Sequence, residues 1–235
     1  MAIDSEATLR LTYYNDAYSG STNATNACQG FHSAGPSSRI GLIYFNNLKD
    51  TLRTKKIKQI TLTLSINING GDGTRPRQIR FCRSKPNSEQ YINTVNTGGI
   101  YGSHFIDLGV NNGLGEELGV LTCSEVTSND SKLKTFQLNS ASNKSLFDNF
   151  TACLEAGDTL FVLYNGQNKD DTGYGYSKDY LVVESASISV DCVSYDPLYL
   201  CDEAGLSKYD ICIYNGTSWD LYVPCIATAD GYAVG

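Results

Sequence analysis

The segment Ile60-Thr61-Leu62-Thr63-Leu64-Ser65-Ile66-Asn67-Ile68 decides the fold class, because every second residue is apolar and every other residue is small and polar. Successive side chains of a β-strand point to opposite faces, so this pattern predicts a strand with one face in a core and one face in water. Comparable apolar runs, separated by Gly, Asn, Asp or Ser, recur along the chain. We expect further strands at residues 8–14, 39–46, 78–82, 104–108, 133–138, 159–164 and 180–191.

One segment, residues 144–154, has helical i, i+3, i+4 spacing and precedes the apolar strand at 159–164. We expect it to form a short helix that covers the end of a β-sandwich. The Gly-rich cluster at 69–73 predicts a hairpin loop between the strands on either side of it. The sequence therefore predicts an all-β protein, with a jelly-roll β-sandwich over residues 1–192 and a small C-terminal β-hairpin extension, the docking segment, over residues 193–235.

The hairpin of that extension is visible in the stretch YDICIYNGTSWDLYVP at residues 209–224. Two alternating apolar runs flank Asn215-Gly216-Thr217-Ser218, and Asn-Gly supplies the positive φ of a tight turn. An isolated two-stranded ribbon is only marginally stable in water, so its aromatic residues need another surface to cover them. We expect the hairpin to dock, on its own body or on another subunit, through Tyr214, Trp219 and Tyr222.

The charge distribution is uneven, with a net charge of −7 overall. Half of the 18 basic residues lie between residues 53 and 85, whereas residues 193–235 carry six acidic residues and one lysine. This distribution is compatible with contact between copies of the chain or with solvated strand edges and loops. Because the whole chain is acidic and the basic belt lacks interleaved aromatics, we expect no nucleic-acid binding. No apolar run approaches a membrane span, so we expect no membrane insertion.

The eight cysteines permit two interpretations, a disulfide framework or reduced core residues. The N-terminal residues 1–6 have neither the basic nor the apolar region of a secretory signal, so we expect the chain to be made in a cytoplasm, where thiols stay reduced. Buried reduced cysteine is therefore favoured. The sequence has no C-x-x-C pair, and His32 and His104 have no ligand-spaced partners, so we expect no metal and no cofactor.

The segment 164–176 combines three tyrosines with amides and acids around several glycines. Aromatic faces stack on sugar rings while amides and carboxylates bind hydroxyls, so these residue types suit a glycan. The candidate glycan-binding residues are Tyr164, Asn165, Asn168, Asp171, Tyr174 and Tyr176. Any long surface loop has a similar composition, and that interpretation also stays open. We find no paired carboxylates, nucleophile and base set or phosphate loop, so we expect no enzymatic activity.

Two resemblances add to this picture. Residues 56–64, 155–164 and 185–190 look like strands of the jelly-roll domains shared by carbohydrate-binding modules and many phage adhesins. The stretch Ile213-Tyr214-Asn215-Gly216-Thr217-Ser218-Trp219 resembles the Tyr-Asn-Gly-x-x-Trp hairpins near the ends of virion structural proteins in tailed phages of gut bacteria.

The resemblance implies a non-enzymatic virion structural protein, in a tail, baseplate, fibre or head decoration, that is assembled in the host cytoplasm. Its partners would be other virion proteins and copies of itself, with a bacterial surface glycan as a candidate ligand. The alternative is a soluble carbohydrate-binding module.

Overall fold

The computed structural model describes residues 1–14, 25–31, 38–49, 51–52, 55–69, 77–95, 99–123, 131–165 and 180–194, and six short strands between residues 198 and 234. For the six short strands, and for Phe31, Ile68, Asn69, Arg77, Tyr180 and Ser194, the description covers the backbone alone.

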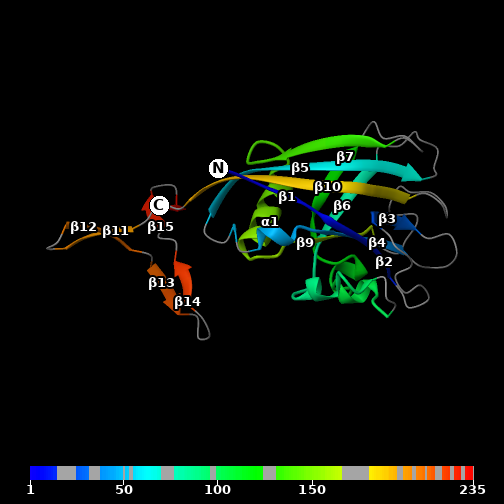
Figure 1. Cartoon of the computed structure of the whole chain (residues 1–235), viewed down its shortest axis with the longest axis horizontal. Coiled ribbons are helices and arrows are strands. Elements are labelled where there is room, and N and C mark those ends of the chain that lie inside the picture. The colour runs from blue at the N-terminus through cyan, green and yellow to red at the C-terminus, as the bar shows by residue number, and fades with distance from the viewer. Residues whose placement is uncertain are drawn as a thin grey trace.

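The body of the protein is one antiparallel sheet of ten strands that curls until it is nearly barrel-shaped (Figure 1). The strand order is β7-β6-β9-β4-β3-β10-β5-β8, with β1 also paired to β10 and β2 to β4. The strands are β1 (Ala2–Glu6), β2 (Thr8–Tyr13), β3 (Ala27–Phe31), β4 (Ser38–Tyr44), β5 (Lys55–Asn69), β6 (Arg77–Arg83), β7 (Glu117–Cys123), β8 (Lys132–Leu138), β9 (Leu160–Leu163) and β10 (Tyr180–Ser194). The predicted all-β class is confirmed, whereas the jelly-roll connectivity stays a prediction.

The main hydrophobic core lies inside the curl of the sheet. Its apolar side chains on β5 are Ile60, Leu62, Leu64 and Ile66, all fully buried, as the alternation predicted. The helix α1 (Lys144–Glu155) covers this core with its apolar stripe. On α1, the Phe150 ring stacks on Phe161 of β9 with a centroid distance of 4.2 Å. Burial of such side chains supplies most of the stability of a body of this kind.

A second, smaller core lies on the outer face of β4, β6 and β9. It is covered by residues 84–95 and 99–115, which contain the short 3₁₀ turns η2 (Ser88–Tyr91), η4 (Gly102–His104) and η5 (Asn111–Gly113). The strand expected at 104–108 is therefore wrong. The N–H groups of Phe105 and Ile106 both donate to the carbonyl oxygen of Gly102, at 2.9 and 3.0 Å. This local turn buries two adjacent side chains on one side, which a strand cannot do.

The other expected strands and the helix are confirmed, with bounds shifted by a few residues. The hairpin loop expected at 69–73 is wrong, because β5 and β6 do not pair with each other. β10 pairs with β5 from Tyr180↔Asn69 to Ser194↔Lys55, and β8 occupies the other side of β5. β6 lies instead between β7 and β9.

The cysteine expectation is confirmed for the part of the chain whose side chains are described. Cys28, Cys82, Cys123, Cys153 and Cys192 are all free and buried. Burial raises the pKa of the Cys28 and Cys82 thiols to about 12 in each case. These thiols therefore stay protonated and behave as small apolar core groups.

After β10 the chain forms three β-hairpins in succession. They pair β11 (Leu198–Asp202) with β12 (Gly205–Tyr209), β13 (Ile211–Tyr214) with β14 (Trp219–Tyr222), and β15 (Cys225–Thr228) with β16 (Gly231–Val234). The middle hairpin is the predicted one, and Tyr214 pairs with Trp219 across the predicted four-residue turn. The flanking hairpins were not predicted. The division into two domains near residue 193 stays a prediction.

Candidate functional site

A groove runs along the polar outer face of the sheet above β10. Its floor is formed by Ser187 and Ser189 of β10, whose side chains are small. Asp4 and Glu6 of β1 form one wall, and Thr61 and Thr63 of β5 form the other, together with Ser5 and Ile188 at the base. The groove has a volume of about 380 Å³. It exists because serine on the central strand leaves room between longer side chains on the two neighbouring strands.

The strand register sets the spacing of these groups. Ser189 pairs with Asp4 on one side and Thr61 on the other, and Ser187 pairs in the same way with Glu6 and Thr63. Since adjacent strands lie about 4.8 Å apart, the acidic wall and the threonine wall are separated by roughly 10 Å. Further along the row, Thr63 Oγ1 lies 3.3 Å from Thr135 Oγ1 of β8. The result is a regular array of hydroxyl groups with carboxylates along one side.

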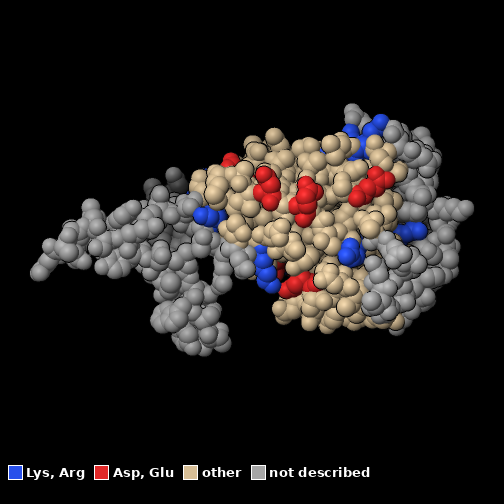
Figure 2. Space-filling model, viewed as in Figure 1, with Lys and Arg blue, Asp and Glu red and all other residues tan. Residues whose placement is uncertain are grey.

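The electrostatic character of this face is acidic. In Figure 2, acidic side chains follow the band of β1 and β10, and basic side chains lie mainly toward the margins of the body. The carboxylates of Asp4 and Glu6 are exposed. Carboxylates accept hydrogen bonds, while serine and threonine hydroxyls both donate and accept. The groove therefore suits a ligand with many hydroxyl groups, although its lining contains no aromatic ring for stacking.

Glu184 extends the acidic band beyond the groove. It lies at an irregularity of β10, where the register shifts between Val183 and Ser185. Its carboxylate accepts hydrogen bonds of 3.3 Å from Ser65 Oγ and from Asn67 Nδ2. Hydrogen bonds from Ser131, Asn67 and Ser65 hold its pKa below the ordinary value. Glu184 is therefore a charged group already paired within the sheet.

The predicted glycan loop is only partly described. Tyr164 is fully buried, with its ring stacked on Tyr14 at a centroid distance of 6.0 Å. Its ring therefore offers no exposed face to a sugar, and burial raises the pKa of its hydroxyl. Asn165 is half-buried. The other candidates, Asn168, Asp171, Tyr174 and Tyr176, lie outside the described residues, so the loop as a glycan site stays a prediction.

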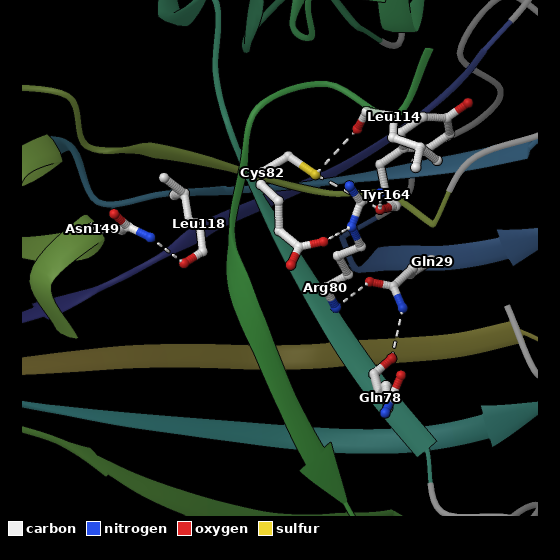
Figure 3. Close-up of polar contacts among 9 residues, drawn as sticks. Gln29, Gln78, Arg80, Cys82, Leu114, Leu118, Asn149 and Tyr164 are labelled. Carbon is white, nitrogen blue, oxygen red and sulfur yellow. Dashed lines mark hydrogen bonds and ion pairs between the residues drawn. The ribbon is translucent and has the colours of Figure 1, made fainter. Parts of the chain in front are cut away.

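The chain enters that loop from a buried polar cluster around Arg80 of β6 (Figure 3). Arg80 is paired through Nε with Glu117 of β7, and its Nη1 donates to the carbonyl oxygen of Tyr164 at 3.2 Å. Cys82 Sγ also approaches that carbonyl, at 3.7 Å. These contacts bind the end of β9 to β6 and β7. The cluster thus fixes the backbone from which residues 166 onward depart.

Gln29 of β3 completes this cluster on the edge of β6 that pairs with β9, next to residues that β9 does not reach. β9 pairs with Phe81 to Arg83 of β6, so the preceding residues lack a strand there. The Gln29 side chain fills the gap: Nε2 donates to the carbonyl oxygen of Gln78, and Oε1 accepts from the N–H of Arg80, both at 2.8 Å. The Gln29 side-chain amide thus makes the two backbone hydrogen bonds that one residue of a neighbouring strand would make with β6. Its role is structural.

The register of the middle hairpin places the three predicted docking residues. Tyr214 and Trp219 are cross-strand partners and so share one face of the ribbon, whereas Tyr222 pairs with Ile211 on the opposite face. No more is described of these side chains, and their docking role stays a prediction.

The histidine expectation can be examined at one position. His104 Nδ1 accepts a hydrogen bond from the Tyr101 N–H at 3.1 Å, and its ring packs edge-on against Tyr91. These contacts serve the η4 turn. Within the described ranges, no three His, Cys, Asp or Glu residues gather closely enough to hold a metal ion. His32 lies outside those ranges.

The sequence alone did not identify four residues of the groove, namely Asp4, Glu6, Ser187 and Ser189. A signal was present in the Ser-x-Ser-x-Ser and Thr-x-Thr-x-Ser runs of β10 and β5, but only the register brings β1 beside them. Searching the described part of the chain for helices long and apolar enough to span a membrane finds none. No protein-family model matches this chain, and no curated protein sequence matches it.

Proposed function

We propose that this chain is a non-enzymatic virion structural protein of a tailed bacteriophage, whose sheet body presents C-terminal hairpins for docking in the particle. The observation that carries the proposal is the series of three hairpins after β10, each a separate two-stranded sheet. A two-stranded ribbon is marginally stable at best in water, and three strands or packing on another element are needed for independent stability. Three such ribbons in succession favour an assembly role.

The sequence of the middle hairpin supports the choice of a virion over another assembly. The resemblance of residues 213–219 to Tyr-Asn-Gly-x-x-Trp hairpins points to proteins of phage particles, in a tail, baseplate, fibre or head decoration. In this proposal the partners are other virion proteins and copies of the chain, and the protein is located in the virion after assembly in the host cytoplasm. Attachment to a bacterial surface glycan is a second role of the same protein.

The test is whether the protein resides in particles. Phage particles are purified by density-gradient centrifugation from a sample that contains this protein. Peptides of the body, such as those from residues 132–165, are then quantified across the gradient by mass spectrometry. We expect these peptides to follow the major capsid protein through the gradient at a constant ratio. Peptides that remain entirely in the soluble fraction, while capsid peptides enter the particle band, would contradict the proposal.

A soluble carbohydrate-binding module is the second candidate, and the groove above β10 is the observation that favours it. Its acidic wall and hydroxyl floor match the hydrogen-bonding needs of a sugar chain. We would screen the protein on a glycan array and then compare the double variant Asp4→Asn/Glu6→Gln with Asp148→Asn, an exposed carboxylate on α1.

If the groove binds a glycan, the double variant should lose about 10-fold or more in affinity, because a hydrogen bond to a charged group contributes roughly 1.5–3 kcal/mol. Asp148→Asn should bind like the wild type. Equal binding by all three proteins would exclude the groove, and binding to no glycan would remove this candidate.

A further inference from the structure

The groove above β10 carries negative charge that its own lining does not neutralise. Asp4 and Glu6 are both exposed, and neither takes part in an ion pair within the described part of the chain. Among the described residues that line the groove, none is Lys, Arg or His. A ligand in the groove therefore meets two carboxylates that have no cationic partner there.

The negative charge continues along β10 beyond the groove. Side chains two residues apart on a strand share a face, so Ser65 and Asn67 of β5 lie on the same outer face as the threonine wall. The Glu184 carboxylate accepts hydrogen bonds from both of them, which places it on this face as well. In Figure 2, acidic side chains form a row along this band, and the basic side chains lie toward its margins. An elongated ligand along β10 would remain near acidic groups over its length.

The strand geometry gives the two groove carboxylates separate positions. Asp4 and Glu6 lie two residues apart on β1, and an antiparallel strand rises about 3.4 Å per residue, so their Cα atoms are about 7 Å apart. Each carboxylate can thus contact a different unit of one ligand. Ser187 and Ser189 on the floor offer hydroxyls that both donate and accept hydrogen bonds. The groove combines a charged wall with a neutral floor.

The lack of a stacking ring makes charge the main discriminating feature of the groove. The described lining contains no aromatic residue to pack on a sugar face. A hydrogen bond between neutral groups contributes little net free energy, because it replaces a similar bond to water. A hydrogen bond to a charged group is roughly twice as strong. The carboxylates are therefore the groups by which this groove can prefer one kind of glycan over another.

We propose that the groove selects glycans with free amino groups, whose ammonium groups bind Asp4 and Glu6. This inference rests on the glycan-binding role proposed for the groove, and it names the class of glycan. An ammonium group supplies three donors, and carboxylates only accept, so the two are complementary. Uronic acids and phosphorylated sugars place like charges against the acidic wall and are repelled.

The experiment compares two sugar tetramers that differ in charge. The β-1,4-linked tetramers of glucosamine and of glucose have the same length and linkage, but glucosamine has an amino group in place of one hydroxyl on each ring. Binding is measured by titration calorimetry at about pH 5.5, where amines and carboxylates are both charged. We expect the glucosamine tetramer to bind about 10-fold more tightly at about 20 mM NaCl. The difference should shrink at about 300 mM NaCl, because salt screens exposed charges.

The acidic wall is tested with the double variant Asp4→Asn/Glu6→Gln. It keeps the size of both side chains and should reduce the preference for the glucosamine tetramer to about 3-fold or less. The matched control is Asp148→Asn, which removes an exposed carboxylate on α1, outside the groove. This control should keep the full preference.

Several results would overturn the inference. Equal affinity of the wild type for both tetramers would show that the groove does not select charge, and the glycan role would still stand. An equal loss of preference in Asp148→Asn would assign the effect to the overall charge of the protein. Tetralysine that binds as tightly as the glucosamine tetramer, with the same dependence on Asp4 and Glu6, would identify the groove as a site for basic peptide segments. Failure to bind either tetramer would also refute the inference, and the glycan array then decides separately whether the glycan role survives.

Discussion

Replacing Gln29 with methionine should destabilise the body by far more than the same change at an exposed glutamine. Gln29 is fully buried, and its side-chain amide makes two hydrogen bonds of 2.8 Å to the backbone of β6, one to the carbonyl oxygen of Gln78 and one from the N–H of Arg80. Methionine keeps the approximate length and volume of the side chain but removes both partners. The change therefore isolates the hydrogen bonds from the packing.

The magnitude follows from the surroundings of the two orphaned groups. An unsatisfied buried backbone group costs about 1–3 kcal/mol. The Arg80 N–H is buried and should incur a value near the upper end, whereas the Gln78 carbonyl is only partly buried and can be reached by water. We expect the free energy of unfolding to fall by about 2–4 kcal/mol in total.

The assay is urea denaturation followed by far-UV circular dichroism, because the only tryptophan lies in the hairpins and does not report on the body. Gln137→Met is the matched control, since Gln137 of β8 is exposed. Its effect should stay within about 0.5 kcal/mol. Equal midpoints for the two variants would refute the reasoning that Gln29 substitutes for a strand.

The remaining predictions concern a glycine, the buried thiols and the hairpins. Gly41→Ala would place a Cβ 2.9 Å from both the backbone N and the backbone O of Cys28. It should therefore lower the free energy of unfolding by about 3 kcal/mol in the same denaturation assay. The control Gly109→Ala, in an exposed turn, should not lower it. Burial raises the pKa values of Cys28 and Cys82 from 9.0 to about 12. The unfolded chain therefore loses these protons first, and the stability that the pair contributes is complete below pH 9 and should fall by about 3 kcal/mol per pH unit toward pH 12. Urea midpoints at pH 8 and pH 10 check this, and the Cys28→Ala/Cys82→Ala protein should show a shallower fall. Deleting residues 195–235 should leave the melting temperature of the body within about 2 °C of the full-length value, because its described core residues all precede residue 195. Loss of cooperative melting in the truncated chain would show that the hairpins belong to the body.

The sequence predicted the central strands because their side-chain patterns are strong and local. In β5 the alternation of Ile60, Leu62 and Leu64 with small polar residues matches the buried and solvated faces that the structure shows. The helix at Lys144–Glu155 was equally visible from its apolar stripe. Where one face of an element meets a core and the other meets water, the local pattern is enough.

The failures share a different physical cause, namely partners that are distant in sequence or absent from the pattern. The strand predicted at 104–108 is wrong because hydrogen bonds from Phe105 and Ile106 to Gly102 form a local turn. Both side chains belong to the second core, which the apolar-polar alternation of the sequence does not indicate. β5 and β6 were joined as a hairpin, whereas β10 and β8 pair with β5. Register between strands far apart in the chain is decided by matching whole strands, and a single stretch of sequence does not contain that information.

The candidate sites were limited in the same way. Asp4 and Ser189 line one groove although about 185 residues separate them, and only the pairing of β1 with β10 brings them together. Tyr164 is a candidate glycan-binding residue in the sequence because it ends a predicted strand and begins a stretch of tyrosines, amides and acids, yet its ring is buried against Tyr14. A tyrosine at the end of a strand can face either a core or a ligand, and composition alone does not distinguish the two.

The attachment of the hairpins to the body has a mechanical consequence under the proposed function. Force on a docked hairpin reaches the body through the C-terminal end of β10. Along its length, β10 is paired with β5 at 14 positions and with β1 at five. The first residue of the chain reinforces this end: the Cys192 N–H donates to the Met1 carbonyl oxygen at 2.9 Å, and the Met1 ammonium donates to the Cys192 carbonyl oxygen at 3.0 Å. Ladder hydrogen bonds run perpendicular to the strands, so a pull along β10 loads them together instead of one at a time. A long central strand held on both sides is therefore well suited to bear an assembly contact, and a short edge strand in its place would be peeled away bond by bond.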